Sequence, residues 1–558
     1  MKVATASDSP GRNRAIDFRN PDNGAWPIMA IALLLIVQFA LIFTHAVNWD
    51  ESYHYGQLYD LATGQPLGAL QTLYLRAYTW IVALPGNAID HVVIARIGQW
   101  LCEWVTLAMI FVLARRFVDR TSAIVATLAY LATGYILQHG FALRADPMVT
   151  AVLIAALALF TRSTLGWRGI LGVGLLAGFA PMLSIKAVLY APAFAGIAWL
   201  RWCEFGRTGK AALRFVAIGA IAIATFAIVF ALHSAMLAPK VAAVDGSIGL
   251  ANSAASRMFF IGRPNNLGSL IQGILTGLGL TSLVVAAPFA IAKRAGSRAE
   301  KIALAGLLLP AVLPFVYENT APYFYVFMLA PVAVACATSV AWLRPKIPAM
   351  VMTALLVALA IPVAIGDNRT TIDNQRRLAT ELDAMFPAPV AYFDHADVAP
   401  RNFKRNPMLT PWGYRGYLHR GVPVYRQTME REPVPLLVPN WWVLRGMLNG
   451  SDEFFLPEDA KVLRENYLPF NGPIWLAGKT IAPGPAKAVE ILVPGPYTVR
   501  DANVVIDGVN HAIGAIVLLN RGEHRIAATG GGTPARLVWG NRIEPRDRLD
   551  FQATWVPF

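Results

Sequence analysis

The chain has 558 residues, of which 56% are hydrophobic and only 15% charged, and its formal net charge is +14 at pH 7. Soluble domains average about 25% charged residues, so this composition excludes an ordinary soluble globular protein. The three cysteines, Cys102, Cys203 and Cys336, lie in or beside apolar stretches and provide no disulfide framework. Fifteen of the 48 basic residues lie in short loops between apolar runs, where membrane topology explains the positive charge more simply than a nucleic-acid partner does.

The N-terminal tail, residues 1–26, is polar, and the apolar run 27–47 that follows is long enough to span a membrane. The run continues directly into Asn48-Trp49-Asp50-Glu51, so we expect an uncleaved first helix. Further apolar runs lie at 92–113, 121–138, 147–161, 170–185, 187–200, 212–233, 268–292, 302–317, 323–342 and 349–366. Together they predict a polytopic α-helical membrane protein with about eleven transmembrane helices. The runs 170–185 and 187–200 are short and contain prolines, which fits either a tight hairpin or a broken helix.

Basic residues concentrate in alternate loops, which predicts that these loops share one side of the membrane with the N-terminal tail. They are Arg115, Arg116, Arg120, Arg162, Arg168, Arg201, Arg207, Lys210, Arg214, Lys293, Arg294, Arg298, Lys301, Arg344 and Lys346. By the positive-inside rule this side is cytoplasmic. An odd number of spans then exports everything after residue 366.

The exported tail has no run long enough to span a membrane, and its composition predicts two regions beyond the transmembrane module 27–366. Region 367–485 alternates short apolar runs at 389–393 and 434–438 with a helix-like stretch at 457–467, which predicts a small α/β unit. Region 486–558 predicts a β-rich, sandwich-like unit with strands at 490–493, 498–506, 515–519, 524–528 and 536–539.

Two adjacent carboxylates, Asp50 and Glu51, follow the first span on the exported side, where an ionisable pair suggests chemistry. The structural alternative is that Asn48 or Asp50 only caps a surface helix that begins at Tyr53. The segment continues with His54 and Tyr55 as an aromatic, amphipathic stretch that fits the membrane surface.

Arg144 and Asp146 form a second polar pair in the next exported loop. Their alternatives are a solvated ion pair at a helix start, with Pro147 in the first turn, or part of a pocket for an anionic lipid head. Lys186 lies alone in an apolar stretch, either as a snorkelling side chain or as a phosphate ligand.

The exported loop 238–268 contains Arg257 and Arg263 and is either a lid over a substrate or an inert connection. Glu318 and Tyr323 lie in a polar, aromatic patch between two late spans, where tyrosines are also common as a membrane-interface belt. The tail aromatics Trp412, Tyr414, Trp441 and Trp442 fit either a buried core or a sugar-stacking surface. The sequence lacks the GxxxxGK[ST], HExxH, CxxC and GxGxxG motifs, so neither ATP hydrolysis nor zinc chemistry is indicated.

The order of these motifs resembles the GT-C class of membrane glycosyltransferases, in the branch of protein O-mannosyltransferases and lipid A aminoarabinose transferases. The resemblance covers roughly residues 27–365 and rests on Asp50-Glu51 after the first span, Tyr55 and Gly64-Gln65-Pro66 in the following loop, and Arg144-x-Asp146. It implies a bacterial inner-membrane enzyme with a polyprenyl-phosphate-linked sugar as donor and Asp50 as the catalytic base, with Glu51 as its substitute.

The same resemblance implies that Arg144, Lys186, Arg257 and Arg263 are the candidates for binding the donor phosphate. His54, Tyr55, Asp146, Glu318 and Tyr323 are the candidates for the substrate pocket. The acceptor would be lipid A, another glycan or a protein, and no cofactor or metal is assigned. Two alternatives stay open: a transporter or flippase of a lipid-linked sugar, and a noncatalytic scaffold.

Overall fold

The computed structural model describes residues 24–67, 72–235, 259, 266–406, 411–529 and 532–554. They belong to two compact units. Unit 1 comprises residues 1–41, 98–235 and 239–366, and unit 2 comprises residues 42–97, 236–238 and 367–558. Unit 2 therefore combines the C-terminal region with the segment that follows the first span.

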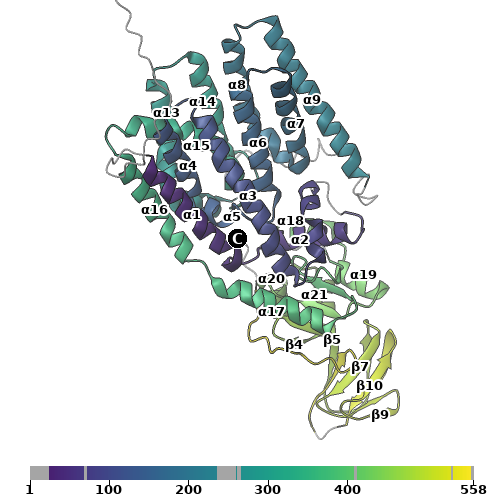
Figure 1. Cartoon of the computed structure of the whole chain (residues 1–558). Helices are drawn as coiled ribbons and strands as arrows, with labels where there is room; N and C mark the ends of the chain where they lie inside the picture. Colours follow the sequence, from purple (N-terminus) through teal and green to yellow (C-terminus); the bar gives the residue numbers. More distant parts are fainter. Residues whose placement is uncertain are drawn as a thin grey trace, which may run out of the picture. The chain divides into compact units, whose positions relative to one another are not determined.

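Unit 1 is helical (Figure 1). Its α-helices are α1 (Ala25–Thr44) and α3 (Ala88–Ala114), which both continue into unit 2, and α4 (Arg120–Leu131), α5 (Gly134–His139), α6 (Ala145–Arg162), α7 (Trp167–Leu183), α8 (Ala191–Glu204), α9 (Gly209–Ser234), α12 (Leu267–Thr276), α13 (Leu278–Lys293), α14 (Arg298–Leu308), α15 (Phe324–Leu343) and α16 (Ala349–Ile365). Its 3-10 helices are η2 (Ile185–Tyr190) and η3 (Leu309–Phe315).

Helix α15 is the centre of unit 1, because it is buried along almost its whole length and packs against α4, α6, α13 and α14. Helix α9 is the opposite case: its mean hydropathy reaches 2.7, yet none of its most apolar window is buried in protein. An apolar helix with this exposure is suited to face lipid. Helix α7 packs closely on α9 through Gly178, where a Cβ would lie 2.2 Å from the carbonyl oxygen of Ala222.

Among the described helices, six are long and apolar enough to cross a membrane, or seven if the bent pair α12 and α13 is one span. A mostly helical fold with several apolar helices and a β-rich C-terminal region is thus confirmed. The figure of about eleven spans stays a prediction, because the runs 121–138, 268–292 and 302–317 are each divided into shorter helices. The uncertain runs 170–185 and 187–200 are two helices, α7 and α8, joined by η2.

Unit 2 contains the helices α2 (Trp49–Ala62), η1 (Leu73–Ala83), α17 (Arg369–Met385), α18 (Pro411–Arg420), α19 (Val424–Arg431), α20 (Trp442–Leu448) and α21 (Pro457–Asn466). Its strands are β1 (Ala391–Asp394), β2 (Phe403–Lys404), β3 (Leu436–Val438), β4 (Tyr467–Asn471), β5 (Ile474–Ile481), β6 (Lys487–Ile491), β7 (Gly495–Arg500), β8 (Val504–Ile506), β9 (Val509–His511), β10 (Ile516–Leu519), β11 (Gly522–Ala528) and β12 (Ala535–Trp539).

The strands form two sheets. The larger has the order β10-β7-β12-β5-β3-β1-β2, with β4 also paired to β5, and the smaller has the order β6-β11-β8-β9. Strand β1 pairs in parallel with both β2 and β3, whereas the other pairs are antiparallel. The side chains of β1 and β3 are all buried and belong to the core of the unit, whereas β2 is a partly exposed strand at the edge of the sheet.

One predicted strand was wrong in its extent. The run 498–506 is two strands, β7 and β8, which belong to different sheets. The chain turns at Asp501, whose φ of 70° lies in the left-handed region and cannot continue a strand.

Candidate functional site

The first turn of α2 carries Asp50 and Glu51. Asn48 is its N-cap: the Oδ1 atom of Asn48 accepts a hydrogen bond from Glu51 N at 3.1 Å, and Oε2 of Glu51 accepts one from Asn48 N at 3.2 Å. This reciprocal capping box fixes the helix start at Trp49, four residues earlier than the capping alternative placed it. The capping role of Asn48 is therefore real, and it leaves the role of Asp50 open.

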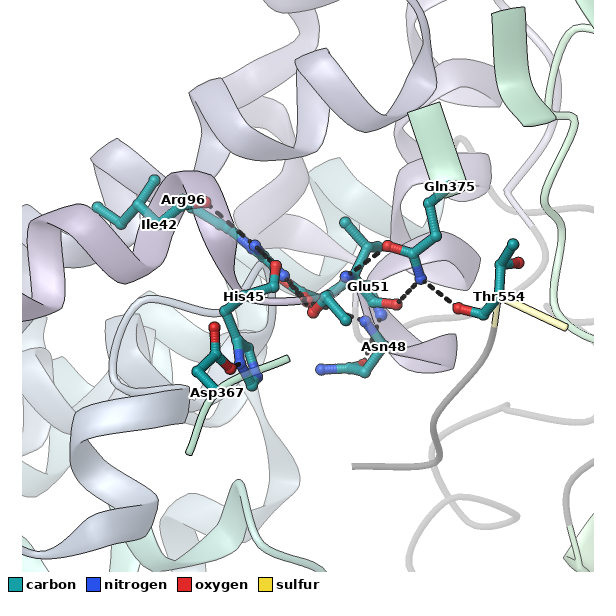
Figure 2. Close-up of polar contacts among 10 residues, drawn as sticks. Ile42, His45, Asn48, Glu51, Arg96, Asp367, Gln375 and Thr554 are labelled. Atoms are coloured by element: carbon teal, nitrogen blue, oxygen red, sulfur yellow. Dashed lines mark hydrogen bonds and ion pairs between the residues drawn. The ribbon is translucent and has the colours of Figure 1, made fainter. Parts of the chain in front are cut away.

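Glu51 is fully buried and bound by Arg96 of α3, which is also fully buried (Figure 2). The Nε atom of Arg96 lies 2.8 Å from Oε1 of Glu51, and its Nη2 atom lies 2.5 Å from Oε2. Arg96 also donates hydrogen bonds to the carbonyl oxygens of Ile42 at 3.2 Å, His45 at 2.8 Å and Ala46 at 2.9 Å. All five N–H donors of the guanidinium thus have an acceptor, and one side chain joins the end of α1 to the start of α2.

The link between α1 and α2 is also held by α17 (Figure 2). Gln375 accepts a hydrogen bond from Val47 N at 2.8 Å, and its amide nitrogen donates to the carbonyl oxygens of Val47 at 2.7 Å and Thr554 at 2.9 Å. His45 Nδ1 lies 2.5 Å from Oδ1 of Asp367. These contacts fix the backbone immediately before Asp50.

Asp50 and Glu51 have different environments although they are neighbours. Successive helix residues point in directions about 100° apart, so Glu51 faces the buried Arg96 while Asp50 is partly exposed. Both oxygens of Glu51 are engaged in the ion pair, which favours a positioning role for Glu51 over the base role considered for it. Sequence analysis missed Arg96, although an arginine inside the apolar run 92–113 is itself a signal of a buried partner.

His54 and Tyr55 lie further along α2. Tyr55 donates its hydroxyl hydrogen to Nδ1 of His91 at 2.6 Å, since Nε2 of His91 lies 3.0 Å from the carbonyl oxygen of Leu84 and is assigned the ring hydrogen. Burial raises the pKa of Tyr55, so its hydroxyl stays protonated. Tyr55 lines a cavity of about 230 Å³ together with His91 and Arg401. The ring of His54 instead packs edge-on against Tyr74.

Arg144, Asp146 and Lys186, three of the predicted site residues, lie together in unit 1. Nζ of Lys186 lies 2.7 Å from Oδ1 of Asp146, and Nε of Arg144 lies 3.3 Å from Oδ2 of the same carboxylate. The guanidinium of Arg144 also lies over the ring of Tyr323, 3.2 Å from its centroid, and Lys186 lies 5.0 Å from that centroid. These side chains are all at least nine-tenths buried, except that of Lys186, which is 11% exposed. Asp146 and Arg144 are therefore not a solvated pair, and Lys186 is held by Asp146 instead of reaching outward.

The carboxylate and the lysine of this cluster come from two different helices. Asp146 lies in the first turn of α6, where the helix dipole favours a carboxylate, and Lys186 lies in η2 between α7 and α8. Two cations share one carboxylate here, and Tyr323 supplies the face of an aromatic ring to both. Such a cluster is suited to bind an anion.

Unit 1 also contains an apolar cavity. It has a volume of about 170 Å³ and is lined by Leu270, Gly273, Met328 and Tyr325, two residues after Tyr323. Glu318 is half-buried, and its carbonyl oxygen accepts a hydrogen bond from the Asn266 side chain at 3.3 Å. Arg257 and Arg263 lie outside the described residues.

The tail aromatics separate into two groups. Tyr414 and Trp441 are buried in the core of unit 2, as their structural alternative predicts, whereas Trp442 is 55% exposed. The side chain of Trp412 lies outside the described part. In the described ranges, no three His, Cys, Asp or Glu side chains are grouped so as to hold a metal ion.

The sequence matches no protein-family model and no curated protein. The fold is similar to that of ArnT from Cupriavidus metallidurans bound to undecaprenyl phosphate, with a TM-score of 0.50, 12% identity, and coverage of 76% of this chain and 95% of that one. It is also similar to the apo Archaeoglobus fulgidus oligosaccharyltransferase, with a TM-score of 0.50, 12% identity, and coverage of 79% and 72%. Both are GT-C glycosyltransferases, so the predicted resemblance is confirmed at the level of the fold.

Proposed function

We propose that this protein transfers a single sugar from a polyprenyl phosphate carrier to a hydroxyl acceptor on the exported side of a bacterial inner membrane. The observation that carries this proposal is the fold shared with almost the whole of ArnT, whose structure holds undecaprenyl phosphate. A fold alone does not define an activity, so the assignment depends on the chemistry of two groups of residues.

Asp50 is the proposed base. It is partly exposed at the start of a helix that Glu51 and Arg96 hold in place. Asp50 takes the proton of the acceptor hydroxyl while that oxygen attacks the anomeric carbon from the face opposite the phosphate. The new bond forms as the bond between the anomeric carbon and the phosphate oxygen breaks, so the configuration inverts and polyprenyl phosphate leaves.

Arg144 and Lys186 are the proposed ligands of the donor phosphate. A carrier of this class has an anionic head and a long apolar tail, and unit 1 contains both a cationic cluster and an apolar cavity. Cations at the phosphate stabilise the negative charge that develops on the leaving group. This scheme assigns the catalytic steps to side chains and includes no metal.

The Asp50 assignment is tested with the purified full chain and a panel of polyprenyl-phosphate sugars. We expect Asp50→Asn to lose about 10²–10⁴-fold in transfer rate while it still binds donor, because only the proton acceptor is removed. Asp60→Asn, at the other end of the same helix, is the matched control and should keep the rate. If Asp50→Asn keeps wild-type turnover, the base assignment is wrong. Movement of labelled lipid between leaflets without a glycosylated product would instead indicate a flippase.

The phosphate assignment needs a variant that does not strand a buried charge. Lys186→Met alone leaves Asp146 short of one partner, so the double variant Asp146→Asn/Lys186→Met is compared with Asp146→Asn alone. We expect the loss of Lys186 to weaken donor binding about tenfold and to change acceptor binding little. A larger effect on the acceptor than on the donor would remove Lys186 from this role.

The proposed orientation has the N-terminus in the cytoplasm and the C-terminal region outside. An alkaline phosphatase reporter fused after Gly366 should therefore be active, because this enzyme requires an oxidising compartment. An inactive reporter at Gly366, together with an active one in the N-terminal tail, would reverse the topology.

A further inference from the structure

The basic loops of unit 1 are joined by polar contacts at one end of the helices. The contacts link five loops that the sequence places on the cytoplasmic side: Arg116 with Glu204, Arg116 with Glu300 at 3.1 Å, Arg201 with the carbonyl oxygen of Ser163 at 2.5 Å, and Arg344 with Asp119. Residues from loops far apart in the sequence therefore lie together, as a shared side of the membrane requires.

Exposed tryptophans mark the level of the membrane surface at this end. Trp167 is 70% exposed, Trp199 is 42% exposed and Trp342 is 40% exposed. Each has a basic side chain within 6 Å of its ring centroid: Arg168 at 5.2 Å, Arg207 at 5.7 Å and Lys346 at 5.7 Å, respectively. Tryptophan beside lysine or arginine is typical of the boundary between hydrocarbon and headgroups.

A cavity of about 660 Å³ opens at this level between α8 and α14. Its wall includes Arg116, Arg207 and Arg298 but only one acidic residue, Glu204. Glu204 is already paired with Arg116 and Arg201. In the part of the chain that the structure describes, neither Arg207 nor Arg298 forms an ion pair, so the cavity carries an excess of positive charge.

Two further features orient an anion and its apolar part. The first turn of α14, capped by Ser297, borders the cavity and adds the positive end of its dipole. Trp199 and Ile302 also line the cavity and are 42% and 38% exposed, so the wall of the cavity includes two exposed apolar side chains. Positive charge above an apolar wall fits an amphiphile with an anionic head.

We propose that this cavity binds the headgroup of an anionic phospholipid from the leaflet at this end of unit 1. The phosphate and any second anionic group contact Arg207 and Arg298, and an acyl chain packs along Trp199 and Ile302. The cavity is lined entirely by residues of unit 1 outside the Arg144, Asp146 and Lys186 cluster, so this proposal does not depend on the proposed glycosyl transfer.

Trp199 provides the readout. The full chain is placed in phosphatidylcholine nanodiscs that contain either brominated phosphatidylglycerol or brominated phosphatidylcholine, because bromine quenches tryptophan fluorescence on contact. The quenching of Trp199 is obtained as the difference in fluorescence between the wild type and Trp199→Phe. We expect brominated phosphatidylglycerol to quench Trp199 at a mole fraction about tenfold lower than brominated phosphatidylcholine. In Arg207→Gln/Arg298→Gln this preference should disappear, while quenching by brominated phosphatidylcholine persists and shows that the apolar wall is intact.

The matched control is Arg168→Gln/Lys346→Gln, which removes two cations from the same tryptophan belt outside the cavity. It should keep the preference. A wild type without the preference, or a cavity variant that retains it, overturns the proposal. Inorganic phosphate is added at constant ionic strength to separate the two sources of the anion: if it abolishes the preference, the site takes free phosphate and the lipid assignment is wrong.

Discussion

The ion pair between Glu51 and Arg96 gives the sharpest prediction about stability. Arg96→Met leaves the Glu51 carboxylate buried with no cation, since both side chains are 0% exposed. Removal of one partner from a buried pair costs about 3–5 kcal/mol, because the remaining charge is uncompensated. The carbonyl groups of Ile42, His45 and Ala46 lose a donor in the same change. With an unfolding entropy of about 2.1 cal/mol/K per residue, the 558-residue chain should lose about 3–4 °C in apparent Tm.

The double variant Glu51→Gln/Arg96→Met separates charge from packing. Glutamine keeps an acceptor for Asn48 N but carries no charge, so the double variant should be more stable than Arg96→Met alone. The two changes should thus be non-additive by about 2 kcal/mol, as expected for residues in one buried network. Because Glu51 is next to Asp50, Arg96→Met should also lower transfer activity below its Tm.

The assay is thermal unfolding of the full chain in detergent, followed by tryptophan fluorescence. Arg115→Met is the control, since Arg115 is exposed just beyond the same helix and donates only to the carbonyl oxygen of Val118 among the described residues. It should change stability by no more than about 0.5 kcal/mol. If Arg96→Met unfolds at the wild-type temperature, or if the double variant loses the sum of the single losses, the argument from an uncompensated buried charge fails.

Two further predictions concern the contact between α2 and the loop after β1. Burial, with the nearby carboxylate of Asp394, raises the pKa of Asp397 from 3.8 to about 7, so stability should fall as the pH rises from about 4 to 7 and level off above 7. Asp397→Asn should remove much of that slope in Tm measured across this range, and an unchanged slope would exclude Asp397 as its source. Gly56→Ala places a Cβ 1.8 Å from Oδ2 of Asp397 and should lower the free energy of unfolding by about 1–3 kcal/mol in the same assay. The control is Gly446→Ala, where the nearest neighbour of the added Cβ lies at 3.7 Å, and it should be neutral or stabilising. Equal effects of the two substitutions would contradict the close packing at Gly56.

Much of the helical layout follows from the sequence, because a chain that crosses lipid must satisfy its backbone in helices and must cover them with apolar side chains. The apolar runs, the basic loops and the change to a more polar composition after residue 366 can therefore be recognised from the sequence alone. The same local logic predicts most tail strands. It fails at 498–506, where a single residue, Asp501, divides one β-prone run between two sheets.

The sequence also places two carboxylates after the first span, but it does not tell them apart. Only the tertiary structure does so, because Arg96, 45 positions away, buries its charge against Glu51 and leaves Asp50 partly exposed. Likewise, Lys186 meets Asp146 across 40 positions, although each has a plausible local role when considered alone. Hydropathy can be read from neighbouring residues along the chain. The stability of a buried charge instead depends on which residue, distant in the sequence, the packing brings into contact with it.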